Sequence, residues 1–260
     1  NASHKFQSPI FRDGRFELLP IPEDTCLSGD SLVKYGDLMS FYDPGKSLRQ
    51  YIPEQWWDRA CHADPEFYQY TYGDNCDSAP RAAALKNIKP GDFMFFIARL
   101  VGFAEDRFLK SAGFFLIGYL ELESVLAQVT EIPTHGELQG LNSNAHMRRA
   151  AADPSLLNGF WVFKGSSNSR RFWRAVPVNR DLASKVFRTA DNQPWTWDSN
   201  RSELQTIGSY TRSCRCVIDP SVPEEQEQAD YFWRAIAQYE AFAAAPRSTD
   251  SILGLRAPRE

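Results

Sequence analysis

The sequence predicts an α+β fold, in which a curved β-sheet or small barrel carries helices on its outside and a further helix near the C-terminus. Two long runs of aromatic and branched residues, "DFMFFIARLVGF" (92–103) and "GFFLIGYLELESVLAQV" (113–129), predict adjacent buried strands. An acidic start followed by an apolar stripe predicts a helix over 224–245. No repeat or linker-like tract interrupts the chain, so we expect one domain over residues 1–260.

The elements are expected in the following order. The Pro and Asp-Gly turns within 6–24 predict an extended segment or short hairpin, and "APRAAALKNIKPGD" predicts a helix over 81–87 that ends before Pro90. Gly118, inside the second apolar run, indicates a bulge or tight bend. Residues 158–166 and 169–179 predict a strand pair around a Gly-Ser-Ser-Asn turn.

The last elements are two helices. "DLASKVFRT" predicts a short helix. In the helix over 224–245, the apolar stripe is formed by Phe232, Ile236, Tyr239 and Phe242 or Ala243.

Charge and motif content exclude several common functions. The net charge of −4 gives the whole chain no basic footprint for nonspecific duplex binding, although positive charge gathers at 148–149 and over 164–180. These two stretches indicate either a local basic groove or an ordinary solvated surface. The chain lacks the Gly-rich dinucleotide motif, the Walker A motif, the His-Glu-x-x-His zinc motif and the Gly-x-Ser-x-Gly nucleophile motif.

Cysteine usage and hydropathy indicate a cytoplasmic protein. Five cysteines are an odd number and form no disulfide framework, and no run is long enough for a membrane span or typical of a signal peptide. A zinc ligand set is conceivable, but the Cys-x-x-Cys pair that anchors most such sites is missing. We therefore expect free thiols and no metal site; the residues considered as ligands are Cys61, His62, Cys76, Cys214 and Cys216.

The first candidate for chemistry is the segment His62-Ala63-Asp64-Pro65. Residues i and i+2 of an extended segment point the same way, so His62 and Asp64 are expected to face one cavity. A histidine beside a carboxylate is suited to proton transfer or to metal binding. The alternative is structural, because Asp before Pro initiates turns and histidine can brace a loop.

The second and third candidates would bind a nucleotide. In "NSNAHMRR" (142–149), Asn144, His146 and Arg148 would share one face of an extended segment and could read base edges or phosphate. "FKGSSNSRRFWR" (163–174) could cradle a phosphate and offer a stacking surface. Its predicted contacts are Lys164, Ser166, Arg170 and Trp173. A polar loop and a charged hairpin tip are the structural alternatives.

A resemblance to known families follows from the order of these motifs. A Gly-Asp turn entering an aromatic strand, followed by "FLIGYLEL", is similar to the core of PUA, ASCH and EVE barrels, which bind bases or nucleotides. "SPIFRDGRFELLPIPED", "KYGDL" and "HADPEF" precede these strands, and the series resembles the third of the nucleotide modification associated domain families over most of residues 7–190. The resemblance implies DNA base hypermodification.

Three functions remain open at this point. In the first, the protein takes part in base hypermodification, with His62 and Asp64 as acid–base pair and Arg148, Lys164 and Arg170 holding phosphate. In the second, it is a noncatalytic reader of modified bases. A defence nuclease is the third, but no carboxylate cluster with suitable spacing supports it. The expected partners are DNA or a nucleotide and other enzymes of the pathway, and the sequence indicates no particular cofactor.

Overall fold

The protein is described here by a computed structural model that covers residues 7–23, 27, 29–80, 82–134, 140–188 and 218–240. Its strands are β1 (Pro9–Ile10), β2 (Ile21–Pro22), β3 (Val33–Lys34), β4 (Ala60–His62), β5 (Thr71–Asp74), β6 (Phe93–Ala104), β7 (Arg107–Val129), β8 (Phe160–Gly165) and β9 (Arg170–Pro177). Its α-helices are α2 (Ala145–Ala152), α3 (Arg180–Val186) and α5 (Pro223–Glu240). Single 3-10 turns occur at Tyr35–Asp37, Leu48–Tyr51, Glu54–Trp56, Ala83–Asn87 and Pro154–Leu156. The predicted α+β class is confirmed.

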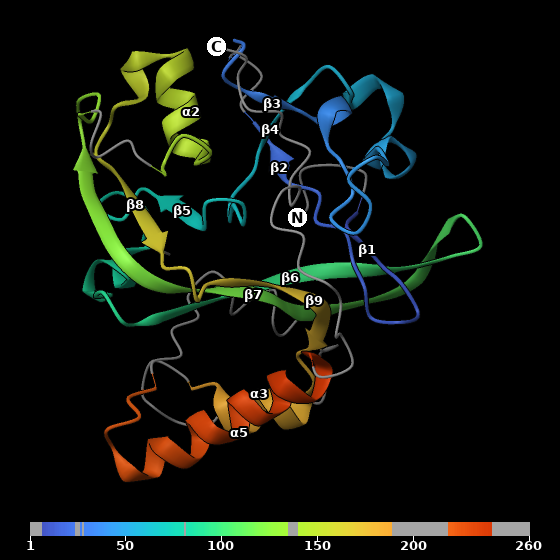
Figure 1. Ribbon diagram of the computed structural model, residues 1–260, viewed down its shortest axis with the longest axis vertical. Coiled ribbons are helices and arrows are strands. Elements are labelled where there is room, and N and C mark those ends of the chain that lie inside the picture. Colours follow the sequence, from blue (N-terminus) through green and yellow to red (C-terminus); the bar gives the residue numbers. More distant parts are fainter. Residues whose placement is uncertain are drawn as a thin grey trace.

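The β6–β7 hairpin is the framework of the molecule (Figure 1). It pairs from Phe93 opposite Glu121 to Ala104 opposite Arg107 and closes through Glu105 and Asp106, both at positive φ. Left-handed conformation at both central residues matches the twist of the two strands. The hairpin is therefore tighter than the two predicted runs suggest, because β7 begins at Arg107, within residues 104–112 that separate those runs.

The predicted irregularity at Gly118 is confirmed. The β6–β7 register shifts between Phe96 and Ile97, which lie opposite Gly118 and Leu116, so Ile117 is the extra residue of a bulge. A Cβ atom on Gly118 would stand 2.4 Å from the carbonyl oxygen of Arg170, so this close approach of β9 requires glycine.

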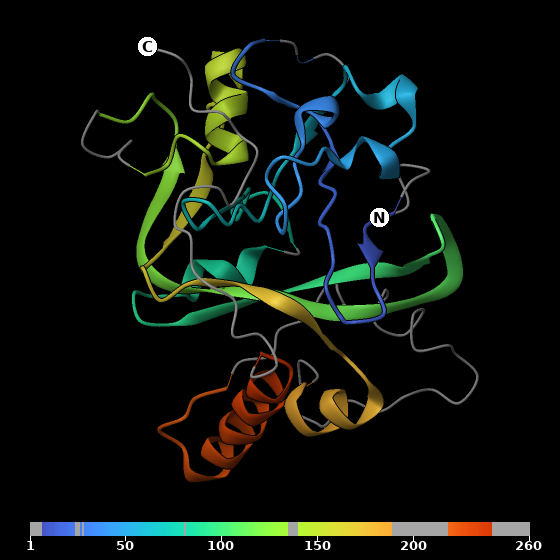
Figure 2. The same cartoon turned by 45° about the vertical axis from the view of Figure 1, so that its right-hand side comes forward.

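β7 is long enough to pair with two different strands on the same side. Its first half pairs with β9, and its second half pairs with β8, which in turn pairs with β5. The prediction that 158–166 and 169–179 form a hairpin with each other was therefore wrong, although both segments are strands. Figures 1 and 2 show β7 curving upward along this course.

Two layers cover the two faces of this curved sheet (Figure 2). α3 and α5 pack below it, where Phe232 and Ile236 of α5 join a buried cluster with Leu116 and Phe172. The predicted helix over 224–245 is confirmed for Pro223–Glu240, and residues 241–245 lie outside the described part. Above the sheet, of which β5 is the last strand beyond β8, lie α2 and a second, three-stranded sheet of order β2-β4-β3. Both sheets are open in the described ranges.

Two further predictions concern the remaining helical segments. The segment over 81–87 is a 3-10 turn at Ala83–Asn87 rather than an α-helix, and "DLASKVFRT" does form a helix, α3. No helix among the described residues has the length and apolar character needed to cross a membrane.

Candidate active site

The His62–Asp64 pair lies where β4 leaves the small sheet. β4 is held between β2 and β3, with Ile21 opposite His62, and the Asp64 backbone N–H donates to the His62 carbonyl at 3.0 Å. His62 Nε2 lies 3.8 Å from Asp64 Oδ2. The two side chains therefore face a common space, as the i, i+2 spacing predicts.

A third side chain, that of His146, reaches the same carboxylate from α2. Its Nε2 lies 3.8 Å from Asp64 Oδ2, and its ring stands 4.9 Å from the His62 ring in an edge-to-face arrangement. The metal-ligating atoms of His62, Asp64 and His146 all lie within 4.8 Å of one another. We call these three residues the His–Asp–His cluster.

The prediction that 142–149 is extended was wrong, and the correction explains how His146 is placed. Asn144 is the N-cap of α2, and its side-chain oxygen accepts from the backbone N–H of His146 and of Met147. Its amide nitrogen donates to Thr71 Oγ1 on β5. This cap fixes the first turn of the helix against β5.

Gly73 on β5 makes room for the histidine. A Cβ atom there would stand 2.5 Å from Cδ2 of the His146 ring, which is closer than any ordinary contact. The backbone N–H of Gly73 also donates to Asp64 Oδ2 at 2.8 Å. Gly73 therefore positions both the carboxylate and the imidazole.

Glu23 orients His62 from behind. Its Oε2 lies 3.0 Å from His62 Nδ1, and Arg149 of α2 forms an ion pair with the other oxygen at 3.2 Å. A carboxylate next to Nδ1 places the proton on that nitrogen, which leaves the lone pair of Nε2 directed at the cluster. Glu23 was not among the predicted site residues, because its only local signal is an acidic residue beside the Pro22 turn.

The electrostatics of Asp64 are unusual for a buried acid. Its side chain is 3% exposed, and Oδ1 has no hydrogen-bond partner in the described part of the chain. Burial raises the pKa of Asp64 well above its usual value, against a lowering by the Gly73 N–H, and nearby Asp74 and Glu66 raise the pKa further. A buried, incompletely paired carboxylate costs stability, so such a group is more typical of a functional site than of a structural one.

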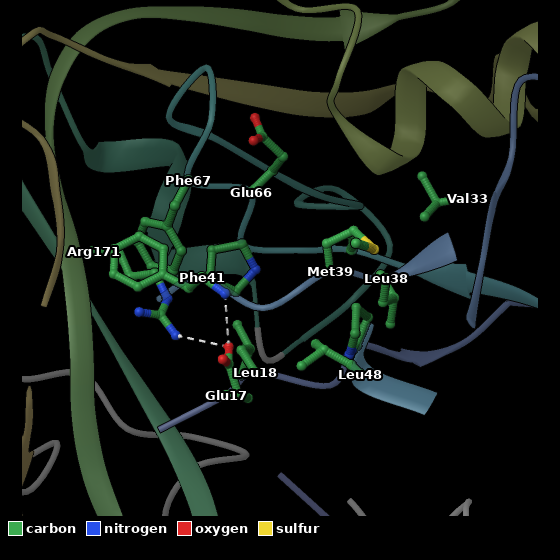
Figure 3. Close-up of a pocket in the computed structure, with 13 residues that line it drawn as sticks. Glu17, Leu18, Val33, Leu38, Met39, Phe41, Leu48, Glu66, Phe67 and Arg171 are labelled. Carbon is green, nitrogen blue, oxygen red and sulfur yellow. Dashed lines mark hydrogen bonds and ion pairs between the residues drawn. The ribbon is translucent and has the colours of Figure 1, made fainter. Parts of the chain in front are cut away.

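A cavity of about 60 Å³ lies on the other side of the same segment (Figure 3). Ala63 and Pro65, which alternate with the two cluster residues, line it together with Glu17, Phe41 and Arg171. Ligand pockets for drug-sized molecules usually measure hundreds of Å³, so a base does not fit this cavity as it stands.

The other predicted binding residues on α2 and β8 make contacts within the chain. Arg148 donates through Nε to the Ser143 carbonyl and through a terminal nitrogen to the Ser31 carbonyl, each at 3.2 Å. Lys164 lies on β8 opposite Thr71, half-buried. The structure thus places Lys164 and Arg148 on elements next to the His–Asp–His cluster.

The remaining three predicted residues lie along the turn and β9. Ser166 Oγ donates to Glu121 Oε2 at 2.9 Å. Arg170 is exposed and lies 3.8 Å from Glu240 at the end of α5, whereas the Trp173 ring packs edge-on against Tyr42. None of these contacts involves the His–Asp–His cluster, so the structure does not unite the predicted phosphate and stacking residues with it.

The cysteines of the described segments are free. Cys61 and Cys76 are buried thiols without a disulfide partner, and burial raises the pKa of both. Cys214 and Cys216 lie outside the described residues.

Comparison with known proteins gives one match. The family model of nucleotide modification associated domain 3 matches residues 1–217. Neither the curated proteins nor the solved structures give a match. The family model covers well over half of the chain, including every residue of the His–Asp–His cluster. The chain therefore belongs to the nucleotide modification associated domain 3 family, and this membership implies a role in nucleotide modification.

Proposed function

We propose that the protein is an enzyme of DNA base hypermodification, acting on a nucleotide or on a base flipped out of DNA, and that the His–Asp–His cluster is its reaction centre. The observation that carries this proposal is the convergence of two imidazoles on one buried carboxylate, of which Oδ1 has no hydrogen-bond partner in the described chain. A base inside a duplex is out of reach of any such centre, so an enzyme that acts on DNA must flip it.

The geometry supports an enzyme more than a noncatalytic reader. A reader requires stacking surfaces and hydrogen-bond donors around the base, but it does not require groups that move protons or hold a cation. The cost of burying Asp64 is difficult to explain by recognition alone, because a neutral amide would serve that purpose without the desolvation of a charge.

The proposal does not depend on the predicted phosphate contacts. Asn144, Arg148 and Ser166 direct polar atoms at partners within the chain. Lys164, Arg170 and Trp173 remain proposed nucleotide-binding residues, and their substitution tests that role separately. We further propose that the protein works in the cytoplasm beside other enzymes of the modification pathway, in keeping with its free buried thiols.

Nucleoside mass spectrometry on DNA from the native host or phage tests the function. Deletion of the gene is expected to remove one unusual nucleoside or to accumulate its precursor, and a His62→Ala strain is expected to reproduce the deletion. An unchanged nucleoside profile in the deletion strain would contradict the enzyme and favour the reader, for which binding to modified DNA would then be measured. Normal modification in the His62→Ala strain would contradict the proposed centre.

A further inference from the structure

The His–Asp–His cluster combines three ligand types that bind transition metals. Neutral imidazole nitrogens and carboxylate oxygens suit first-row divalent ions, and two histidines with one carboxylate form a three-ligand set that leaves coordination positions open. The three residues come from separate places, since His62 and Asp64 flank the end of β4 and His146 begins α2. Such convergence of side chains from two separate elements, β4 and α2, is typical of a built site rather than of neighbouring surface groups.

The distances are compatible with a metal ion. Both Nε2 atoms lie 3.8 Å from Asp64 Oδ2, beyond hydrogen-bonding distance. Ligand atoms about 2.0–2.1 Å from a tetrahedral zinc ion stand about 3.3 Å apart. The two 3.8 Å distances exceed this spacing by about 0.5 Å, and the widest pair, within 4.8 Å, exceeds it by at most about 1.5 Å. Rotation of the side chains alone supplies movements of this size.

The hydrogen bonds behind the cluster have the arrangement found around metal-ligating histidines. Glu23 binds Nδ1 of His62 and so directs the basic Nε2 at the cluster, and Arg149 holds Glu23 in place. The Gly73 N–H binds one oxygen of Asp64 and fixes the carboxylate plane. Outer partners of this kind set the tautomer and orientation of the ligands.

The charge balance also calls for a cation. Asp64 and Glu23 are both buried at the cluster, with side chains 3% and 5% exposed. Arg149 pairs with Glu23, and no fixed cationic side chain pairs with Asp64 among the described residues. A buried carboxylate is stable when it is paired or coordinates a metal.

We propose that His62 Nε2, the Asp64 carboxylate and His146 Nε2 bind one divalent transition-metal ion, such as Zn²⁺ or Fe²⁺, with positions left for water or substrate. The inference deepens the proposed function, because it gives the reaction centre a cofactor, but metal binding itself is testable without knowing the substrate. The ion copurifying with the protein decides between Zn²⁺, which activates water or polarises a substrate group, and a redox-active ion.

Metal binding is tested on the full-length protein with Co²⁺ as a spectroscopic probe. After chelator treatment and dialysis, the wild type is expected to bind one equivalent of Co²⁺ with visible d–d absorption and to gain thermal stability with increasing Co²⁺. Elemental analysis of the protein purified without chelator identifies the natural ion. Absence of Co²⁺ and Zn²⁺ binding below about 1 mM, where affinity is negligible for a cofactor site, would overturn the inference.

Variants locate the bound ion. Asp64→Asn and His146→Gln are each expected to weaken Co²⁺ binding at least about 100-fold, since loss of an outer partner alone costs up to that factor. Binding unchanged in both variants would overturn the assignment. A measurement on the wild type needs no folded variant: Zn²⁺ is expected to protect His62 and His146 from carbethoxylation by diethyl pyrocarbonate, read by peptide mass spectrometry. Reactivity unaffected by Zn²⁺ would also contradict the site.

Glu66→Gln is the matched control. Glu66 is a buried acid two residues from Asp64, but it accepts from the backbone of Tyr68 and Gln69 and from the hydroxyls of Thr71 and Ser143. A glutamine oxygen can keep the backbone bonds, and the two hydroxyls can reverse to accept from its amide. This variant is expected to bind Co²⁺ as the wild type does.

The two proposals can fail separately. If Co²⁺ does not bind but Asp64→Asn abolishes base modification, the metal inference is wrong and the reaction centre stands. If Co²⁺ binds at the cluster but deletion of the gene leaves the nucleosides unchanged, the metal site stands and the proposed function is wrong.

Discussion

Asp64 and Glu17 are two buried carboxylates whose surroundings differ. Glu17 accepts from Ser40 Oγ at 2.5 Å and from the Phe41 N–H at 3.1 Å, and its Oε2 lies 3.8 Å from the Arg171 guanidinium. Asp64 accepts one bond from Gly73, and its Oδ1 has no hydrogen-bond partner in the described chain. The two side chains are similarly buried, at 5% and 3% exposure.

We interpret this difference as that between a structural acid, Glu17, and an acid of the proposed reaction centre, Asp64. Arg171 donates to the Phe16 carbonyl and stacks over the Phe16 and Phe41 rings, so the Glu17 site holds its own counter-charge and satisfies it locally. At Asp64, two imidazoles stand just outside hydrogen-bonding distance, and the missing partner is the ion or substrate that we propose. Burial alone does not mark a site; a buried carboxylate with incomplete pairing is the stronger indication.

The largest expected effect is on stability at the Glu17 site. Arg171→Met leaves Glu17 buried without its cation, and loss of one partner of a buried ion pair typically costs about 3–5 kcal/mol. Urea unfolding at neutral pH measures this cost, and the double variant Glu17→Gln/Arg171→Met is expected to regain much of it through coupling between the two positions. A decrease in the free energy of unfolding of less than about 1 kcal/mol would contradict this prediction, because that is the contribution typical of an exposed ion pair.

Glu23→Gln is expected to have the next largest effect, on metal binding at the other site. The amide cannot hold His62 in its present tautomer as the carboxylate does, so Co²⁺ affinity should fall about 10–100-fold. Titration followed by visible absorption measures the change, with Glu17→Gln as the control that should bind normally. Equal Co²⁺ affinity in the wild type and in Glu23→Gln would contradict the proposal that Glu23 orients His62.

Gly73→Ala tests how closely β5 and α2 must approach. The added methyl group would stand 2.5 Å from the His146 ring, so we expect destabilisation of about 1–3 kcal/mol and weaker Co²⁺ binding. Gly45→Ala is the control, because the nearest atom to its Cβ is 3.5 Å away and the change should stay within about 0.5 kcal/mol. If Gly73→Ala binds Co²⁺ as tightly as the wild type does, the close approach of β5 to the His146 ring is not needed for metal binding.

The smallest expected effect is the pH dependence due to Glu17. Burial raises the pKa of Glu17 above its ordinary value of 4.5 despite Arg171. A carboxyl group whose pKa is raised on folding stabilises the protein fully at pH values below its pKa in the unfolded state. This stabilisation is lost as the pH rises through its pKa in the folded state. The wild type should therefore lose stability relative to Glu17→Gln as pH rises from about 4.5. Urea unfolding of both proteins from pH 4 to 8 measures this, and a relative gain by the wild type would contradict it.

Local patterns predicted much of the fold. The β6–β7 hairpin, the bulge at Gly118 and helix α5 follow from apolar runs, a glycine within a strand and an amphipathic period. These signals lie within each element, so one sequence is sufficient to find them. The pairing of β8 and β9 with β7 rather than with each other is a long-range contact, which no pattern within a single element encodes.

The candidate site was predicted in part. His62 and Asp64 are neighbours along one strand, so their spacing was informative, whereas Glu23 and His146 reach them through long-range packing that no local pattern encodes. The helix that carries His146 did have a signal, since Asn144 precedes the helix-forming run Ala145–Ala152, and an asparagine at that position is a typical N-cap. The predicted phosphate and stacking residues were inferred from residue types along the chain, and in the structure Arg148, Ser166 and Arg170 contact partners within the chain.

The most direct test of the comparison measures base modification in two strains that differ in which buried acid is neutralised. The chromosomal gene would be replaced by Asp64→Asn in one strain and Glu17→Gln in the other, and the nucleosides of their DNA quantified against wild-type and deletion strains at matched protein levels. We expect Asp64→Asn to match the deletion and Glu17→Gln to match the wild type. Normal modification in Asp64→Asn would contradict the proposal that this carboxylate belongs to the reaction centre.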